Sequence, residues 1–354
     1  MNPLSSALVT LAGGNSLSSG ESCAAVGTLL DGGAPDAIVA AFLTALRLKG
    51  ETADELEGAV TAIRERMIRW ESGMNALPLL DTCGTGGDGA DTVNISTAAA
   101  IVVAACGVSV VKHGNRAATS RSGSSDVLSA LGVAADLEPG MLHRCLAELK
   151  IAFLFAPRFH AGLACVAPVR RQLPFRTIFN LLGPLCNPAS PTHQLVGVPN
   201  EMQADLLAQV IARQPHIGRA AVVTGWNGLD EVTLEGPTQV RLIESGRVRR
   251  EEWEPQDFGL SRHAVAAIKV RDPVESAARL TRAFEGEKGP VRDYVLANSG
   301  AALWVTGVSL LREGTDRAAS AIDSGAAARL LDRWRALAPA ASAGGAPSTL
   351  TGGP

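Results

Sequence analysis

A glycine-rich segment between two apolar runs constrains the fold of this chain more than any other feature. The run that begins at Leu79 ends at Asp81, and the segment CGTGGDGADT follows it. A helix is predicted from about Ser96 to Cys106, and a second strand at 108–112. Strand, loop, helix and strand within about 30 residues form a βαβ unit. The strands of such a unit are parallel, so the sequence predicts an α/β fold with a central, mostly parallel sheet.

The rest of the chain continues this alternation between short apolar runs and amphipathic patterns, which is typical of an α/β domain. The expected strands are 152–155, 195–198, 220–224, 232–234 and 240–243, and the expected helices are 141–150, 202–212, 273–284, 291–305 and 317–337.

Residues 1–70 have a helical pattern instead. Pro35-Asp36 opens an amphipathic segment that Gly50 closes. Thr52 and Glu55 then form a capping-box pattern in front of a second apolar stripe. Two amphipathic helices joined by a short turn predict a small helical unit, because their apolar faces must pack against something. At the other end, 338–354 is rich in Ala, Ser, Gly and Pro, and we expect a disordered tail there.

Composition and charge exclude several classes of protein. The 354 residues are 46% hydrophobic and 19% charged, which fits a globular chain. A net charge of −3 gives no overall basic field for nucleic acid. No apolar run reaches the ~18 residues of a membrane span, and no basic residue precedes the first apolar run as in a secretory signal. The six cysteines form no CxxC pair and indicate free thiols, so we expect a cytoplasmic protein.

The loop 84–89, GTGGDG, matches the glycine pattern of dinucleotide-binding folds, but its context differs from theirs. The predicted helix begins several residues too late, and the second strand ends in Lys112-His113, where a ribose-binding acid would be needed. The chain contains no G-K-[ST], which excludes a P-loop. The loop still suits phosphate, because its glycines allow backbone N–H groups to approach an anion closely.

Neighbouring segments also suit anions. Asn94–Thr97 leads into an apolar helix and is expected to provide capping side chains and free N–H groups at the positive helix end. Lys112–Arg116 follows a strand, and Ser120–Asp126 precedes a short helix. Any one of these segments could be an ordinary turn or cap. Three within about forty residues, at the carboxyl ends of strands, favour a phosphate site, because open α/β sheets bind ligands there.

Two charged pairs are candidates for other ligands. Asp230-Glu231 could hold Mg²⁺, which prefers carboxylate oxygens, water and substrate phosphates, although a solvated turn gives the same dipeptide. Arg170-Arg171 could bind a substrate carboxylate through a bidentate fork, or could be a surface pair at a helix start. The histidines at 143, 160, 193, 216 and 263 have no metal-ligand spacing and are expected to pack or to lie at the surface.

The strings DTCGTGGDGADTVNISTAAA and VVKHGNRAATSRSGSSDVL together resemble anthranilate phosphoribosyltransferase, an enzyme of tryptophan biosynthesis. The resemblance covers nearly the whole chain and includes FLFAPRFHAGL, VAPVRRQLPFRTIFNLLGPLCNP, LVGV, GLDEVTLEGPT and GGAPDAIVAAFLTALRLKGET. It implies transfer of the 5-phosphoribosyl group from phosphoribosyl pyrophosphate to the amine of anthranilate, with release of pyrophosphate and without a covalent enzyme intermediate. No nucleic acid or membrane partner is expected.

The resemblance further implies a domain organisation and an assembly. A helical domain would cover 1–75, with helices from about 168–190 joining it, and an α/β domain that binds phosphoribosyl pyrophosphate would cover 76–337. A homodimer would form through the helical part.

It also implies the site residues. Two Mg²⁺ ions per monomer would be held by Ser96, Asp230 and Glu231. Anthranilate would meet Gly84, His113, Asn115 and Arg170, with Arg170 near its carboxylate. Lys112 and Arg170 would position the substrates, and no covalent or obligate acid/base residue is expected. Phosphoribosyl pyrophosphate would contact Gly84, Gly87, Asp88, Thr92, Asn94, Ile95, Ser96, Thr97, Lys112, His113, Gly114, Asn115, Arg116, Ala117, Ala118, Thr119, Ser120 and Ser124.

Three positions depart from the family pattern, and two other classes of protein are considered. Cys83 replaces a common aliphatic residue, Val93 a common Phe, and Pro174 a usual Gly. Pro174 fixes φ and removes a donor in the loop after Arg170. The alternatives are a pyrimidine nucleoside phosphorylase of similar architecture and a non-catalytic relative that binds nucleic acid. The Lys-His-Gly-Asn stretch and the Asp-Glu pair favour the transferase.

Overall fold

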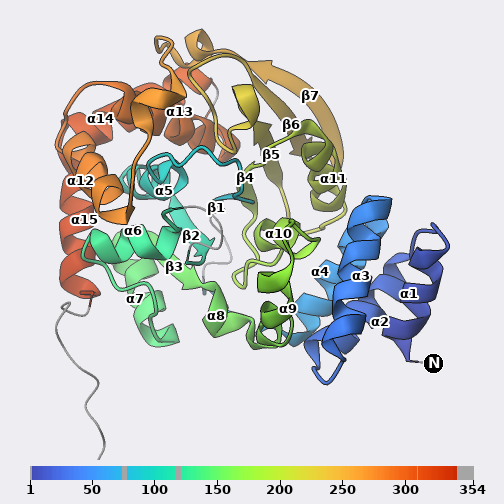
Figure 1. The fold of residues 1–354 in the computed structure, drawn as a ribbon. Helices are drawn as coiled ribbons and strands as arrows, with labels where there is room; N and C mark the ends of the chain where they lie inside the picture. The colour runs from blue at the N-terminus through green and yellow to red at the C-terminus, as the bar shows by residue number, and fades with distance from the viewer. Residues whose placement is uncertain (1, 74–77, 117–120, 309, 341–354) are drawn as a thin grey trace, which may run out of the picture.

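A seven-stranded sheet forms the centre of the computed structural model, which describes residues 2–73, 78–116, 121–308 and 310–340 (Figure 1). The strand order is β3-β2-β1-β4-β5-β6-β7. The strands are β1 (Leu79–Gly84), β2 (Ser109–Gly114), β3 (Ile151–Phe155), β4 (His193–Gly197), β5 (Arg219–Thr224), β6 (Thr238–Glu244) and β7 (Arg247–Trp253).

The first five strands of the sheet pair in parallel, and β6 and β7 are antiparallel. The predicted α/β class with a mostly parallel sheet is therefore confirmed. From β1 the chain adds β2 and β3 on one side and then returns to place β4 on the other side of β1. The strand order thus reverses between β1 and β4, and open α/β sheets bind ligands beyond the carboxyl ends of such strands.

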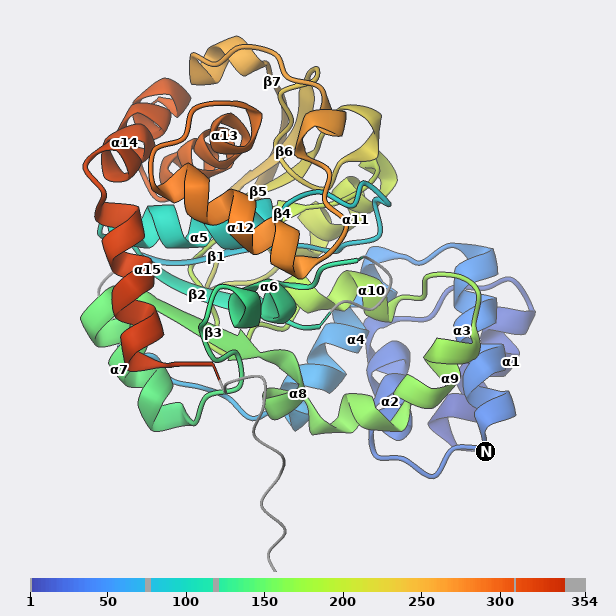
Figure 2. The same cartoon turned by 60° about the vertical axis from the view of Figure 1, so that its left-hand side comes forward.

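Both faces of the sheet are covered by helices (Figure 2). Alternate residues point to opposite faces, so Leu80 and Val110 join one apolar core while Leu79 and Val111 join another. The central strands β1, β2 and β4 are therefore buried along almost their whole length. One face packs against α5 (Ile95–Ala105), α6 (Ser124–Ala130), α12 (Pro273–Phe284), α13 (Pro290–Val305), α14 (Leu311–Asp323) and α15 (Ala326–Leu337), and the other against α7 (Pro139–Leu149) and α11 (Glu201–Ala212).

The first four helices form a bundle beside the sheet (blue in Figure 1). Short helices from the middle of the chain lie between this bundle and the sheet, and Phe42 of the bundle shares an apolar core with Val169, Phe179 and Leu182. The bundle helices are α1 (Pro3–Ala12), α2 (Ser19–Leu30), α3 (Asp36–Lys49) and α4 (Ala53–Arg66), and the short helices are α8 (Ala156–Phe159), α9 (Ala167–Gln172) and α10 (Phe179–Leu182). Single 3₁₀ turns occupy Ala161–Cys165, Gly183–Leu185, Trp226–Gly228, Pro255–Phe258 and Val265–Ile268.

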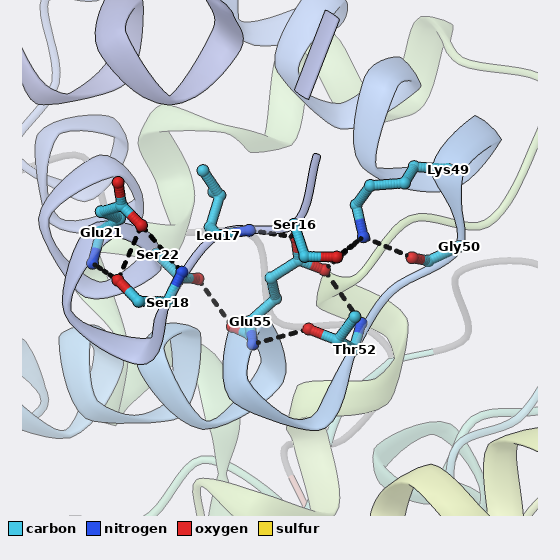
Figure 3. Close-up of polar contacts among 9 residues, drawn as sticks. All are labelled: Ser16, Leu17, Ser18, Glu21, Ser22, Lys49, Gly50, Thr52 and Glu55. Carbon is cyan, nitrogen blue, oxygen red and sulfur yellow. Dashed lines mark hydrogen bonds and ion pairs between the residues drawn. The ribbon is translucent and has the colours of Figure 1, made fainter. Parts of the chain in front are cut away.

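A buried carboxylate ties three segments of the bundle together (Figure 3). Glu55 is fully buried, and its Oε1 accepts a hydrogen bond from the backbone N–H of Leu17 at 2.9 Å. Its Oε2 accepts from the N–H of Thr52 and from Nζ of Lys49, both at 2.9 Å. Thr52 and Glu55 form the capping box expected from the sequence. A buried charge is tolerated when it is paired and hydrogen-bonded in this way.

Three differences from the expected elements have physical causes. Residues 232–234 form no strand, because the Asn298 side chain takes both backbone groups of Val232 at 2.9 Å each. The expected helix at 317–337 is two helices, since Gly325 adopts a left-handed φ of 74° between them. The strand β7 was not expected, because its exposed edge carries mostly charged residues.

The end of the α/β part is longer than expected. The tail was expected to begin at Ala338, but the N–H of Ala134 donates to the Ala338 carbonyl at 2.8 Å, and the N–H of Ala340 donates to the Gly132 carbonyl at 3.0 Å. The remaining tail, 341–354, lies outside the described residues. Across the described ranges, we find no helix with the length and apolar character that a membrane crossing would require.

Candidate active site

A cleft of about 330 Å³ opens at the carboxyl ends of β1 and β2, and Asp230 in its wall lies against Gly197 at the end of β4. The glycine loop after β1, the start of α5 and the end of β2 form its walls, and Arg170, Asp230 and Glu231 complete them. The cleft therefore lies where the strand order reverses, as expected for a ligand site of this fold class.

The glycine loop lies close to the Asp230 side chain. Gly86 and Gly87 have left-handed φ values of 65° and 78°. The N–H of Gly86 donates to Oδ2 of Asp230 at 2.7 Å. At the strand ends, a Cβ on Gly197 would lie 1.6 Å from the Asp230 carbonyl oxygen, so a residue with a side chain would collide with Asp230 there. The loop geometry thus depends on Asp230.

Acidic side chains gather on one wall of the cleft. Asp230 donates its N–H to Oδ2 of Asp88 at 3.5 Å, and Glu231 accepts from the N–H of Ser96 at 3.0 Å. Desolvation raises the pKa of Asp230 well above its usual value, and the negative charges of Asp88 and Glu231 add to the rise. Desolvation also raises the pKa of Glu231 to about 7, against the positive charge of Lys112. The Asp230-Glu231 pair is thus part of the cleft wall and not a solvated turn.

This donor set fits Mg²⁺. Closely spaced carboxylates with raised pKa values favour a bound cation, which relieves their mutual repulsion. Within the described ranges, no group of three or more His, Cys, Asp or Glu side chains is arranged to hold a metal by itself. Mg²⁺ keeps several water ligands and takes one or two carboxylates together with substrate phosphates, so an open donor set suits it.

Lys112 lies beneath the start of α5. Its side chain is buried, and Nζ donates to the Thr82 carbonyl and, at 3.2 Å, to Oγ of Ser96. The ammonium group therefore holds the Ser96 hydroxyl at the edge of the cleft and places a positive charge near the acidic wall.

The expected capping at α5 is wrong in detail. Asn94 is the N-cap residue but makes no side-chain cap bond. Its Nδ2 donates to the Ser122 carbonyl at 3.0 Å, and Oγ of Ser122 donates to its Oδ1 at 2.7 Å. The N–H of Ser96, expected to be free, is taken by Glu231. These long-range partners compete with the local cap. The Asn94 side chain therefore connects the start of α5 to the serine-rich segment instead of capping the helix.

A second cavity of about 200 Å³ adjoins the cleft and contains all four residues expected to meet anthranilate. Its other walls are mostly apolar and include Leu163, Leu182 and Pro184. Arg170 lines both cavities, and its guanidinium carbon lies 5.3 Å from the ring centroid of Phe179. Burial and the nearby charge of Arg176 lower the Arg170 pKa. Arg170 is thus not part of a surface pair, whereas Arg171 is exposed.

Two buried histidines form one wall of this inner pocket. His113 Nδ1 lies 3.1 Å from the Gly183 carbonyl, and His113 Nε2 lies 3.2 Å from Nε2 of His160. Burial lowers the pKa of His113 to about 3 and that of His160 to about 4, so both rings are neutral near pH 7. His160, expected only to pack or to lie at the surface, belongs to the pocket wall.

The structure brings together almost all described residues of the predicted site. Ile95 is the exception, because as the first residue of α5 it faces the apolar core and its N–H bonds to the Val93 carbonyl. Ala117, Ala118, Thr119 and Ser120 lie outside the described residues. The residues that line the cleft are Gly84, Gly87, Asp88, Thr92, Asn94, Ser96, Thr97, Lys112, His113, Gly114, Asn115, Arg116, Ser124, Arg170, Asp230 and Glu231.

Sequence reasoning missed several residues of the site. Arg176 and Phe179 line the cleft, and so do Asp91 and Arg121, which form an ion pair at 3.0 Å. The signal for Arg176 was its place six residues after Arg170, in the same arginine-rich segment.

The fold and site define a two-domain glycosyl transferase. The α/β-domain model of the glycosyl transferase family matches residues 76–328, and its helical-bundle model matches residues 5–67. Anthranilate phosphoribosyltransferase from Methylocella silvestris is 46% identical over 353 residues, which cover 98% of this chain and 99% of that protein. The chain belongs to the anthranilate phosphoribosyltransferase family.

Solved structures agree with this membership. Anthranilate phosphoribosyltransferase from Thermus thermophilus superposes with a TM-score of 0.87 at 38% identity and covers 95% of this chain and 99% of its own. The Saccharomyces cerevisiae enzyme in complex with PRPP and Mg has a TM-score of 0.84 at 30% identity, covering 94% of this chain and 97% of its own. The same yeast enzyme has also been solved in complex with 4-fluoroanthranilate.

Proposed function

We propose that the two adjoining cavities carry out the reaction of this family, in tryptophan biosynthesis. The 5-phosphoribosyl group passes from phosphoribosyl pyrophosphate to the amine of anthranilate, giving N-(5-phosphoribosyl)anthranilate and pyrophosphate. One observation carries the residue assignment. A polar cleft with glycine-loop and acidic walls shares Gly84, His113, Asn115 and Arg170 with a mostly apolar pocket. The shared residues are where a ribose carbon and an aromatic amine would meet.

The polar cleft takes phosphoribosyl pyrophosphate. The glycine loop, the start of α5 and the segments 112–116 and 122–124 line this cavity from three sides. Lys112 and Asn94 are held by hydrogen bonds to Ser96 and Ser122, so the walls are arranged before the substrate enters. Such positioning lowers the barrier without covalent chemistry. The contacts of Ala117, Ala118, Thr119 and Ser120 remain predictions from the family pattern.

The acidic wall holds Mg²⁺ through Asp230, Glu231 and Ser96, and we propose two ions per monomer. When bound, Mg²⁺ supplies positive charge that stabilises the negative charge on the departing pyrophosphate. The carboxylates contribute by their fixed position, since the N–H groups of Gly86 and Ser96 hold Asp230 and Glu231 in place.

The apolar pocket takes anthranilate. Leu163, Leu182 and Phe179 suit an aromatic ring, and the Arg170 guanidinium suits its carboxylate. An arylamine is neutral at pH 7, so its lone pair is available without a strong base. The neutral rings of His113 and His160 do not protonate it. This arrangement positions the amine towards the polar cleft.

Assembly and location complete the proposal. The helical part exposes Val9 on α1 and Leu48 on α3, at 63% and 82%, which fits a homodimer through these helices. Sedimentation of Leu48→Glu against the unaltered chain tests this, because a shared apolar face would not tolerate the charge. All six cysteines are free, as a reducing compartment keeps them, and the cytoplasmic location remains a prediction.

One assay tests the reaction. Purified protein is mixed with anthranilate, phosphoribosyl pyrophosphate and Mg²⁺, and the loss of anthranilate fluorescence is followed. Loss that requires all three components is the expected result. If folded protein binds phosphoribosyl pyrophosphate but fluorescence persists, the acceptor is another nucleophile. A nucleoside phosphorylase would instead turn over a pyrimidine nucleoside with inorganic phosphate and would ignore anthranilate.

A further inference from the structure

Arg176 lies directly on the glycine loop. Its Nη2 donates to the carbonyl oxygen of Thr85 at 2.7 Å. Its guanidinium also fills the space above Gly87, where a Cβ would lie only 1.3 Å from Nη1. Gly87 is therefore required for two reasons, its left-handed φ of 78° and the close approach of Arg176. The arginine and the loop form one unit.

The charges around Arg176 place it between the two halves of the site. Burial lowers the pKa of Arg176, and the negative charges of Asp230 and Asp88 partly offset this effect. Arg170 is close enough on the other side for the two positive charges to repel. Arg176 lines the polar cleft but not the apolar pocket, whereas Arg170 lines both. Of the two arginines, only Arg170 therefore reaches the apolar pocket.

The hydrogen-bonding capacity of Arg176 is only partly used. Its Nε–H is buried and has no hydrogen-bond partner among the described residues. The acids near it form no ion pair with it within the described part of the chain. A buried N–H of a charged group without a hydrogen-bond partner is unfavourable unless a ligand accepts its hydrogen bond. In a cleft that binds an anion, a phosphate oxygen is the complementary partner.

We propose that Arg176 is a second substrate-binding arginine, which holds the glycine loop through Thr85 and donates to the diphosphate of phosphoribosyl pyrophosphate. This inference rests on the proposed function. It divides the anions of the reaction between two arginines, with the diphosphate at Arg176 and the carboxylate of anthranilate at Arg170. Because Arg176 touches the loop, it also orders the backbone that surrounds the same diphosphate.

The test compares Arg176→Met and Arg176→Lys with Arg171→Met, an exposed arginine of the same segment. Binding of phosphoribosyl pyrophosphate with Mg²⁺ is measured by calorimetry without anthranilate, and KM is measured for both substrates. Arg176→Met should weaken phosphoribosyl pyrophosphate binding at least about tenfold, the effect of losing one charge-assisted hydrogen bond, with the KM for anthranilate within about twofold. Arg176→Lys should recover part of the affinity, since it keeps the charge but not the fork. Arg171→Met should match the unaltered chain.

A rise in the KM for anthranilate alone would assign Arg176 to the acceptor and overturn the proposal. Unchanged constants for both substrates would overturn it too. If Arg176→Met does not fold, as judged by circular dichroism, Arg176→Lys alone decides by the same binding measurement. Calorimetry needs no turnover, so it tests Arg176 even if the acceptor proves to be a nucleophile other than anthranilate.

Discussion

The Nε2 atoms of His113 and His160 lie 3.2 Å apart and share a hydrogen bond. The direction follows from the other side of the His113 ring, where Nδ1 faces the Gly183 carbonyl at 3.1 Å. A carbonyl oxygen only accepts, so Nδ1 of a neutral His113 carries the hydrogen and Nε2 carries the lone pair. His160 must then supply the hydrogen between the rings. The Gly183 carbonyl thereby sets the tautomer of His113 at the wall of the apolar pocket.

This pair predicts a pH-dependent cost of replacing His160 with Asn. In the unfolded chain a histidine takes up a proton below about pH 6.5, whereas folded His160 stays neutral down to about pH 4. Its contribution to stability is therefore complete above pH 6.5 and is lost as the pH falls towards 4. The difference in unfolding free energy between the two proteins should shrink by up to about 1.4 kcal/mol per pH unit in this window.

Denaturant melts between pH 4.5 and 8 measure this difference. His113, the titratable group facing His160, also stays neutral when folded, with a pKa of about 3. Burial raises the pKa of Asp81 to about 6, so its contribution to stability grows as the pH falls. Asp81 is present in both proteins, and this contribution therefore cancels in the difference. A difference that is the same at every pH would contradict the paired, neutral rings.

Asp230→Asn should separate the metal role from the structural one. The amide oxygen can still accept from the N–H of Gly86, so the melting temperature without Mg²⁺ should stay close to that of the unaltered chain. At limiting Mg²⁺, kcat/KM should fall about 100-fold, as when one stabilising group at a developing charge is lost. Asp316→Asn, at an exposed surface pair, is the control. Unaffected turnover at limiting Mg²⁺ would remove Asp230 from the metal site.

Arg170→Ala should raise the KM for anthranilate by about tenfold or more, because a charge-assisted bond to its carboxylate is lost. The KM for phosphoribosyl pyrophosphate should change little. Arg171→Ala, one residue further on and exposed, should leave both constants unchanged. Steady-state kinetics with each substrate varied in turn make the comparison, and an unchanged KM for anthranilate in Arg170→Ala would exclude this role.

Gly197→Ala should displace Asp230 and so weaken the metal and substrate site. The new Cβ would lie 1.6 Å from the Asp230 carbonyl oxygen, so the backbone that carries Asp230 must move. We expect a loss of about 2–3 kcal/mol in unfolding free energy, together with weaker binding of Mg²⁺ and phosphoribosyl pyrophosphate. Gly218→Ala is the matched control, because its nearest neighbours would be at 3.7 Å. Equal unfolding free energies of the two variants would show that the end of β4 accommodates a Cβ, which would contradict this prediction.

Glu55→Ala should destabilise the bundle without touching the site chemistry. It leaves the Lys49 ammonium and two backbone N–H groups without their shared acceptor, at a cost of about 3–5 kcal/mol. Chemical denaturation measures this cost. The affinity for phosphoribosyl pyrophosphate below the transition should be unchanged, and a parallel loss of affinity would mean that the bundle shapes the cleft directly.

The sequence predicted the parts of this molecule that depend on neighbours along the chain. The periods of α11 and α12, the capping box at Thr52 and the glycine loop after β1 are local, and each was found where expected. The failures involve distant partners. The Asn298 side chain takes the backbone hydrogen bonds that a strand at 232–234 would make to a neighbouring strand. The Asn94 side chain bonds to Ser122 instead of capping α5.

The same limit applies to the site. The glycine, lysine and acidic segments were found because their composition is unusual over a few residues. His160 and Arg176 acquire their surroundings only when α8–α10 pack against the ends of β1 and β2. No neighbour in the chain marked His160, and the only signal for Arg176 was its place in the arginine-rich segment after Arg170. Their roles follow from contacts across 47 and 91 residues of sequence.

The Glu55 contacts also bear on the order in which the molecule can assemble. All of them join residues between Leu17 and Glu55, so this polar connection can form once the first helices have left the ribosome. The apolar core of the same bundle also includes Val166, Val169 and residues as far along the chain as Ile243 of β6, which are synthesised much later. During translation the polar contacts of the bundle can therefore form before its apolar core is complete.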